Sequence, residues 1–157
     1  VVTEFLTVIA ANIYRKIKYK ESTFYIIPEQ NPGINLDFSI KSRLEESQDV
    51  HRKIKEFCIE NNVSGSRTNL AAVCAEEMTI NIIKFGGKSS NWIDINLCLE
   101  EDILNLRIRD NGVNFNPLEY KNDSEEFDIH GIELVKKISK SMNYIRAIDM
   151  NNTIISF

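Results

Sequence analysis

The sequence is poor in the residues that build metal sites and disulfide frameworks. It has three cysteines and two histidines in 157 residues, and neither Cys-x-x-Cys nor His-x-x-x-His occurs. Zinc ligands usually come in such closely spaced pairs, so a zinc site is not expected. An odd number of cysteines in apolar surroundings is typical of small buried residues in a reducing compartment: Cys58, Cys74 and Cys98.

Long apolar runs, internal repeats and a basic stripe along the chain are also missing. A membrane-spanning helix needs roughly 20 apolar residues, and the apolar start of the chain, residues 1–14, is shorter and contains Glu4. The net charge of −4 does not favour nucleic acid binding. With 43% hydrophobic and 27% charged residues, the composition is that of an ordinary soluble domain. The length predicts one domain with an appendage.

The N-terminal segment, residues 1–33, is expected to be that appendage. Its apolar start runs directly into a basic cluster at residues 15–20. This pattern fits the cytoplasmic end of a membrane span that begins upstream, as the positive-inside rule expects. It fits equally an amphipathic helix that packs on the domain or on a second copy. A linker with a short strand at residues 24–27 follows, and the compact domain is expected at residues 34–157.

Hydrophobic periodicity predicts the elements of that domain. Strict alternation indicates a strand at residues 34–40 and a hairpin of strands at residues 92–99 and 103–109. Helices are expected at residues 44–62, at about residues 69–85 with Thr68 as N-cap, and from Gly131 to about Met142. Two strands, residues 144–150 and 153–157, are expected around a turn at residues 151–152. This order predicts an α+β two-layer sandwich, a mainly antiparallel mixed sheet covered on one face by three helices.

The longest predicted helix carries a carboxylate and a carboxamide near the edge of its apolar stripe. Glu77 and Asn81 are four residues apart and so lie one helical turn from each other. A carboxylate beside a buried stripe must be paired, hydrogen-bonded or used in a site. Taken alone, the pair also fits an ordinary helical interaction at the surface.

Two further motifs follow in a definite order. The strand at residues 103–109 runs into Asp110-Asn111-Gly112 and Phe115-Asn116-Pro117, and a later helix opens with Gly131-Ile132-Glu133-Leu134-Val135. Together with Glu77 and Asn81, this ordered set resembles the GHKL or Bergerat ATP-binding domain of gyrase, heat-shock chaperones and histidine kinases. It is most similar to the branch of anti-sigma-factor serine/threonine kinases. The resemblance covers about residues 34–157.

The resemblance implies roles for individual residues. Asp110 would accept a hydrogen bond from the adenine amino group, Gly112 would let the backbone approach the base, and Thr153 would support the pocket. Asn81 would bind magnesium, and Glu77 would act as general base for attack on the terminal phosphate. The helix opening at Gly131 and Ile132 would meet the phosphates.

The remaining residues of the expected nucleotide site are Lys84, Asn114, Phe115 and Leu134. Lys84 could offer positive charge to a phosphate, and Phe85 stands where many anti-sigma kinases have histidine. Asn114 replaces the second glycine that relatives usually carry after the aspartate. Glu133 replaces a glycine at the later helix, so that a second acidic group lies close to the expected phosphates.

Two functions from different classes are therefore expected. The first is an ATP- and magnesium-dependent serine/threonine kinase that phosphorylates a small antagonist protein and binds a sigma factor. The second is a non-catalytic, nucleotide-sensing cytoplasmic domain of a larger membrane protein, for which Asn114 and Glu133 would be tolerated. A protein-interaction domain with a degenerate pocket is a third, weaker alternative. A bacterial, cytoplasmic setting is implied by the resemblance, with tethering through an upstream membrane domain and a homodimer contact left open.

Overall fold

The structure, a computed structural model, describes residues 33–87, 92–120 and 130–157. The chain divides into two units, Val1–Pro32 and Gly33–Phe157, and the second is described here. The expectations for the N-terminal segment, its short strand and its membrane or dimer contact lie outside the described residues. Within those residues, no helix is long and apolar enough to cross a membrane.

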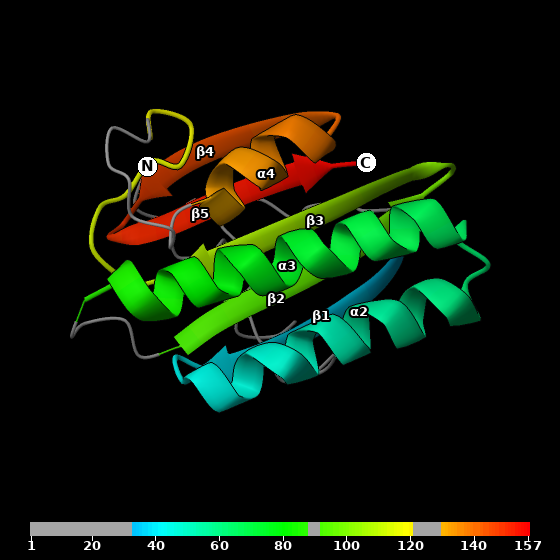
Figure 1. The fold of residues 1–157 in the computed structure, drawn as a ribbon, viewed down its shortest axis with the longest axis horizontal. Coiled ribbons are helices and arrows are strands. Elements are labelled where there is room, and N and C mark those ends of the chain that lie inside the picture. The colour runs from blue at the N-terminus through cyan, green and yellow to red at the C-terminus, as the bar shows by residue number, and fades with distance from the viewer. Residues whose placement is uncertain (1–32, 88–91, 121–129) are drawn as a thin grey trace, which may run out of the picture. The chain divides into compact units, whose positions relative to one another are not determined.

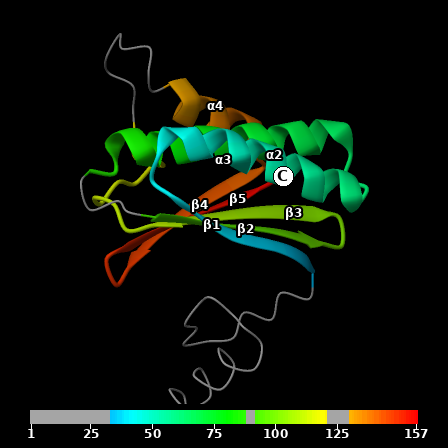
Figure 2. The ribbon, with the colours of Figure 1, turned by 90° about the horizontal axis from the view of Figure 1, so that it is seen from below.

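The described unit is built on a five-stranded sheet with the order β1-β2-β3-β5-β4. The strands are β1 (Ile34–Lys41), β2 (Trp92–Glu100), β3 (Ile103–Asp110), β4 (Ser141–Ala147) and β5 (Met150–Ser156). All four neighbouring pairs of this sheet are antiparallel. Helices α2 (Ser47–Glu60), α3 (Gly65–Phe85) and α4 (His130–Ile138) lie on one face of it (Figures 1 and 2). The predicted α+β sandwich is confirmed.

The core forms where the apolar side of each strand meets the apolar stripe of a helix. On β3, the alternate residues Leu104, Leu106 and Ile108 are almost completely buried, because successive side chains of a strand point to opposite faces. The predicted hairpin is confirmed, with residues 101 and 102 as its turn. Four residues of α2 are buried in the same core: Val50, Ile54, Phe57 and Cys58. The 3-10 turn η1 (Leu44–Glu46) precedes α2, so the predicted helix begins three residues too early.

Helix α3 begins earlier than its sequence pattern predicted. Its N-cap residue is Ser64, and Thr68 lies inside the first turn, where its hydroxyl donates to the Ser64 carbonyl at 3.0 Å. The prediction of Thr68 as N-cap was therefore wrong. Gly65 does not break this helix, since its position is open and helical residues follow directly. The predicted end holds, because the Gly86 amide donates to the Ile82 carbonyl at 2.8 Å.

The C-terminal hairpin differs from the predicted one by about three residues. Met142 lies in β4 and not on α4, because the helix ends as the Ser139 amide donates to Val135 and the Lys140 amide joins Ser156. The turn is at Ile148 and Asp149, whose φ angles of 51° and 58° are those of a tight hairpin turn. Asn151 therefore lies within β5, directly opposite Asp110 of β3. The prediction of a turn at residues 151–152 was wrong.

Candidate functional site

Asp110 takes a place in β3 where the alternation calls for an apolar residue. It follows Leu104, Leu106 and Ile108 on the face beneath the helices, and it is only 5% exposed. The neighbouring strand β5 places Asn151 opposite it and Thr153 opposite Ile108. Both of these residues are also 5% exposed. Two adjacent strands thus place three buried polar side chains at one end of the sheet.

A closed set of hydrogen bonds holds the Asp110 carboxylate. Its Oδ1 atom accepts from the Gly112 amide and from Nδ2 of Asn151, each at 2.8 Å. Nδ2 of Asn151 also donates to the Val113 carbonyl at 2.9 Å. Burial raises the pKa of the Asp110 carboxyl, although these hydrogen bonds and the charge of Arg146 act in the opposite direction. The carboxylate is desolvated but fixed in orientation.

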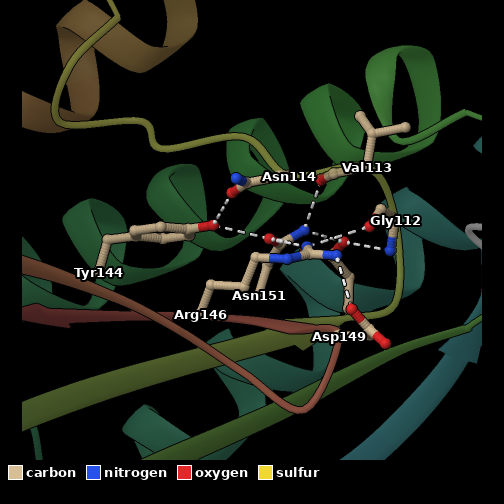
Figure 3. A network of polar contacts seen from close by, with 8 residues as sticks. Gly112, Val113, Asn114, Tyr144, Arg146, Asp149 and Asn151 are labelled. Atoms are coloured by element: carbon tan, nitrogen blue, oxygen red, sulfur yellow. Dashed lines mark hydrogen bonds and ion pairs between the residues drawn. The ribbon is translucent and has the colours of Figure 1, made fainter.

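Side chains of the outer strand β4 also take part in this set of hydrogen bonds (Figure 3). Tyr144 and Arg146 both donate to Oδ1 of Asn151 at 2.7 Å. Arg146 also reaches the Gly112 carbonyl at 3.3 Å and lies 3.7 Å from the exposed carboxylate of Asp149. The Tyr144 hydroxyl also lies 3.0 Å from Oδ1 of Asn114. The segment that leaves β3 is thus tied to the edge of the sheet.

Gly112 is required by the close approach of this segment to the end of α3. A Cβ atom at Gly112 would lie 2.9 Å from the Gly86 carbonyl oxygen and 3.0 Å from its Cα atom. The Val113 amide donates to the same carbonyl at 2.9 Å. A side chain at position 112 would therefore separate the strand end from the helix.

A cavity of about 30 Å³ lies between α3, the end of β3 and β5. One water molecule needs at least about 10–15 Å³, so this space holds about two waters and is too small for a purine. It is lined by polar groups at its base, Asn81, Asp110, Asn151 and Thr153, and otherwise by apolar side chains or glycine: Met78, Ile82, Phe85, Gly86, Val113, Phe115 and Pro117. A nucleotide base therefore fits here only if the wall of the cavity changes.

Glu77 and Asn81 meet the start of α4 at the other end of this region. A Cβ atom at Gly131 would lie 2.1 Å from Oε2 of Glu77 and 3.4 Å from Nδ2 of Asn81. Only glycine therefore lets the opening of α4 lie against the Glu77 carboxylate without displacing it. The structure brings together Glu77, Asn81 and Gly131, which the sequence analysis had assigned to one site.

Asn81 carries a buried polar atom with no partner in the described structure. Its side chain is 5% exposed and donates through Nδ2 to the Glu77 carbonyl at 2.8 Å, whereas its Oδ1 atom has no hydrogen bond. An unpaired amide oxygen is a hard ligand suited to Mg²⁺, which uses few protein ligands and keeps its waters and phosphates. Among the described residues, no cluster of three or more His, Cys, Asp or Glu side chains could hold a metal. The donor set fits magnesium that arrives with a nucleotide.

The other predicted site residues differ in their location and in their exposure to solvent. Phe115 lines the cavity and packs against Tyr120 with ring centroids 5.9 Å apart. On α4, Ile132 is fully buried, whereas Leu134 is 41% exposed. Lys84 is exposed at the end of α3, and Asn114 is exposed and bonded to Tyr144. Glu133 lies in the first turn of α4 and is half-buried.

The residues whose hydrogen bonds fix Asp110 in place were not predicted from the sequence. Asn151, Tyr144 and Arg146 were assigned to a turn and to an ordinary strand, because Asn-Asn is a common turn signal. A usable signal was present in the period of β5, since Asn151 and Thr153 are in phase with Ile155 and Phe157. All four side chains are buried on one face of the sheet.

Comparisons with known proteins bear on the fold. No protein-family model and no curated protein matches the sequence. The chain is similar to a crystal structure of the RsbU and RsbW domains of Rv1364c from Mycobacterium tuberculosis, with a TM-score of 0.60 and 11% identity. The match covers 78% of this chain and 32% of that chain, so this chain spans about a third of its length. At 11% identity this likeness shows the fold alone, and it agrees with the fold that the ordered motifs predicted.

Proposed function

We propose that this chain is an ATP-binding regulatory domain that acts as a serine/threonine kinase of the anti-sigma-factor type on a small partner protein. One observation carries the proposal: a single cavity is lined by both Asp110 and Asn81. These are the residues to which the motifs assigned adenine recognition and magnesium binding. The RsbW domain in the similar structure supports the same branch of the family.

Base recognition rests on the buried carboxylate. An ionised Asp110 can only accept hydrogen bonds, so it favours the 6-amino group of adenine over the 6-oxo group of guanine or hypoxanthine. Thr153 lies two residues from the position opposite Asp110 on the adjacent strand and lines the same cavity. Burial strengthens this interaction because the carboxylate has little competing water.

Phosphoryl transfer would take place at the other end of the site. Asn81 would hold magnesium through its unpaired Oδ1 atom, and the ion would supply positive charge to the phosphate oxygens. Glu77 accepts the proton of the partner's seryl or threonyl hydroxyl as its oxygen forms a bond to the terminal phosphorus. The bond from that phosphorus to the bridging oxygen breaks, and ADP leaves. The Glu77 carboxylate must turn from Gly131 toward the incoming hydroxyl in this step.

Calorimetric titration with ATP and magnesium tests nucleotide binding. We expect the wild type to bind and Asp110→Asn to lose about 100-fold in affinity, because the amide NH₂ cannot accept the proton of the base and a hydrogen bond to a charged group is lost. Asp49→Asn, an exposed carboxylate on α2, is the matched control and should bind like the wild type. If the wild type binds no ATP, the proposed function is wrong.

Release of inorganic phosphate from ATP tests catalysis without the unidentified partner. The wild type should hydrolyse ATP slowly, with water in place of the hydroxyl. Glu77→Gln should bind ATP with similar affinity and lose this release by about 100-fold or more, within the range for general base catalysis. Equal rates in both proteins would show that Glu77 is not the base.

A non-catalytic nucleotide sensor is the second candidate function. It is favoured by the contact of the Glu77 carboxylate with Gly131 and by the acidic Glu133 in the first turn of α4, both near the expected phosphates. In this case ATP binds through Asp110, phosphate release is absent, and Glu77→Gln changes neither. Tethering to an upstream membrane domain belongs to this candidate.

A further inference from the structure

We propose that Asn151 is a positioning residue that holds the Asp110 carboxylate in the orientation in which its free oxygen faces the nucleotide base, and so sets the preference for 6-aminopurines. The inference rests on the proposed nucleotide function and deepens it. Asn151 belongs to none of the motifs that led to the site. It emerged because β5 places it directly opposite Asp110.

The carboxamide of Asn151 has every hydrogen-bonding position filled. Its two Nδ2 protons go to Oδ1 of Asp110 at 2.8 Å and to the Val113 carbonyl at 2.9 Å. Its Oδ1 atom accepts from Tyr144 and from Arg146, each at 2.7 Å. An amide has two donor protons and two acceptor lone pairs, so no capacity is left over. Such an amide, 5% exposed, is held in one orientation.

That orientation decides how the Asp110 carboxylate presents its two oxygens. Oδ1 receives two donors, the Gly112 amide and Asn151. Turning the carboxylate out of its plane would break both bonds. We therefore assign the amino group of the base to Oδ2 of Asp110.

Tyr144 and Arg146 fix which way the amide itself is turned. Arg146 can only donate, so it requires the oxygen of Asn151 on the side of β4, and the Tyr144 hydroxyl donates to the same oxygen (Figure 3). The NH₂ group is then on the side of Asp110, to which it donates. An apolar residue at position 151 would leave the carboxylate with one donor fewer and the Val113 carbonyl without its amide. Base selectivity would then fall even in a folded protein.

The discriminating experiment compares two nucleotides in wild type and Asn151→Leu. ATP carries the 6-amino group, and purine riboside triphosphate lacks it, while the ring and phosphates are otherwise alike. In the wild type, ATP should bind about 10- to 100-fold more tightly than the deaminated analogue. In Asn151→Leu this ratio should fall to about threefold or less, with affinity for the analogue unchanged. Asn143→Leu, at an exposed position of β4, is the control and should keep the wild-type ratio.

A structural role alone would give a different result. General loosening of the domain would weaken both nucleotides equally and leave the ratio unchanged, which would overturn the inference. Tyr144→Phe is the second variant, for use if Asn151→Leu does not fold. It removes one donor to Asn151 and keeps the ring, so the ratio should fall by about threefold, and an unchanged ratio would again overturn the inference.

A readout without nucleotide separates this inference from the proposed function. The pH titration of the Asp110 carboxyl, followed by carbon NMR, should move to higher pH in Asn151→Leu, because a hydrogen bond that favours the charged form is lost. Arg146 of β4 is the charged group that acts on this carboxyl and is present in both proteins. If the wild type binds neither nucleotide, the proposed function fails and base selection by Asn151 fails with it. An upward shift in that case would show only that Asn151 orders the carboxylate.

Discussion

The two ends of the candidate site differ in how many of their polar atoms have hydrogen-bond partners within the protein. At the end proposed to bind adenine, called the adenine end below, Oδ1 of Asp110 and the whole amide of Asn151 have protein partners. At the end proposed to bind phosphate, called the phosphate end below, the buried Oδ1 of Asn81 has none, and the Glu77 carboxylate lies against the backbone of Gly131. A buried polar atom without a partner costs free energy, so the phosphate end is the one that gains most from a ligand. The carboxylate proposed to recognise the base is oriented in advance, whereas the polar groups at the phosphate end are left for a ligand to complete.

The largest effect expected from this comparison is a difference in stability between two asparagine variants. Asn151→Leu should lower the free energy of unfolding by about 3 kcal/mol, because it removes one donor from the buried Asp110 carboxylate, the shared acceptor of Tyr144 and Arg146, and the amide bound to the Val113 carbonyl. Asn81→Leu should lower it by about 1 kcal/mol or less, since Oδ1 of Asn81 has no partner to lose and only the Nδ2 bond to the Glu77 carbonyl is removed. Urea denaturation without nucleotide measures both. Equal losses in the two variants would show that the polar groups at the phosphate end have protein partners, as those at the adenine end do.

A smaller effect is expected from two glycines that differ in their surroundings. Gly112→Ala should lower the free energy of unfolding by about 1–3 kcal/mol, because its Cβ atom would meet the Gly86 backbone at 2.9 Å. Gly65→Ala should raise it by about 0.4–1 kcal/mol, since nothing lies within 4 Å of its Cβ atom and it begins a helix. Thermal unfolding of the two variants should therefore shift in opposite directions. Shifts of the same sign would contradict the close contact between the strand end and α3.

The parts of the fold and site that follow from local sequence patterns could be predicted, whereas those that depend on contacts between distant residues could not. Alternation in β1, β2 and β3 and the ordered motifs predicted the sheet and the likeness to an ATP-binding fold. The support of Asp110 was missed, since it depends on the register between β3 and β5, and no local pattern reports which residues stand opposite each other. The helix start at Gly65 was missed for a related reason. Glycine is a breaker in general, but here its site is open and its helix is held by packing.

The pH dependence of stability should report on the adenine end alone. Because the pKa of Asp110 is higher in the folded than in the unfolded state, the stabilisation from its protonated form is complete below the unfolded pKa of about 3.9. This stabilisation is lost as the pH rises through the folded pKa. Wild type should therefore lose stability relative to Asp110→Asn over that interval, measured by denaturation at several pH values. ATP affinity should change in the opposite direction, since binding needs the ionised carboxylate. Parallel stability profiles would contradict the desolvation of Asp110.

The smallest expected effect is that of the Glu77 charge on the reactivity of Cys74, which lies one turn before Glu77 on α3. Burial, followed by the charge of Glu77, raises the pKa of the Cys74 thiol to about 12. The thiolate is the reactive form, so alkylation by iodoacetamide at pH 8 should be at least about 100-fold slower than in the unfolded chain. Glu77→Gln should speed it by less than about tenfold, because the charge is the lesser cause. Glu76→Gln is the control, since that carboxylate pairs with His51 on α2. Fast labelling in the wild type would show that the phosphate end opens locally.

The place of β5 in the sheet has a consequence for biosynthesis. β5 lies between β3 and β4, although β3 precedes it in the chain by about forty positions, and Asp110 bonds to a residue 41 positions later. While the polypeptide emerges from the ribosome, β1 to β3 can pair through earlier contacts, but the Asp110 carboxylate has neither Asn151 nor Arg146 beside it. Because β5 is synthesised after β1, β2 and β3, its contacts with β3 can form only after those three strands are available. A nascent chain would therefore acquire the proposed preference for adenine only when β5 has been inserted, so nucleotide selectivity would mark the completion of folding.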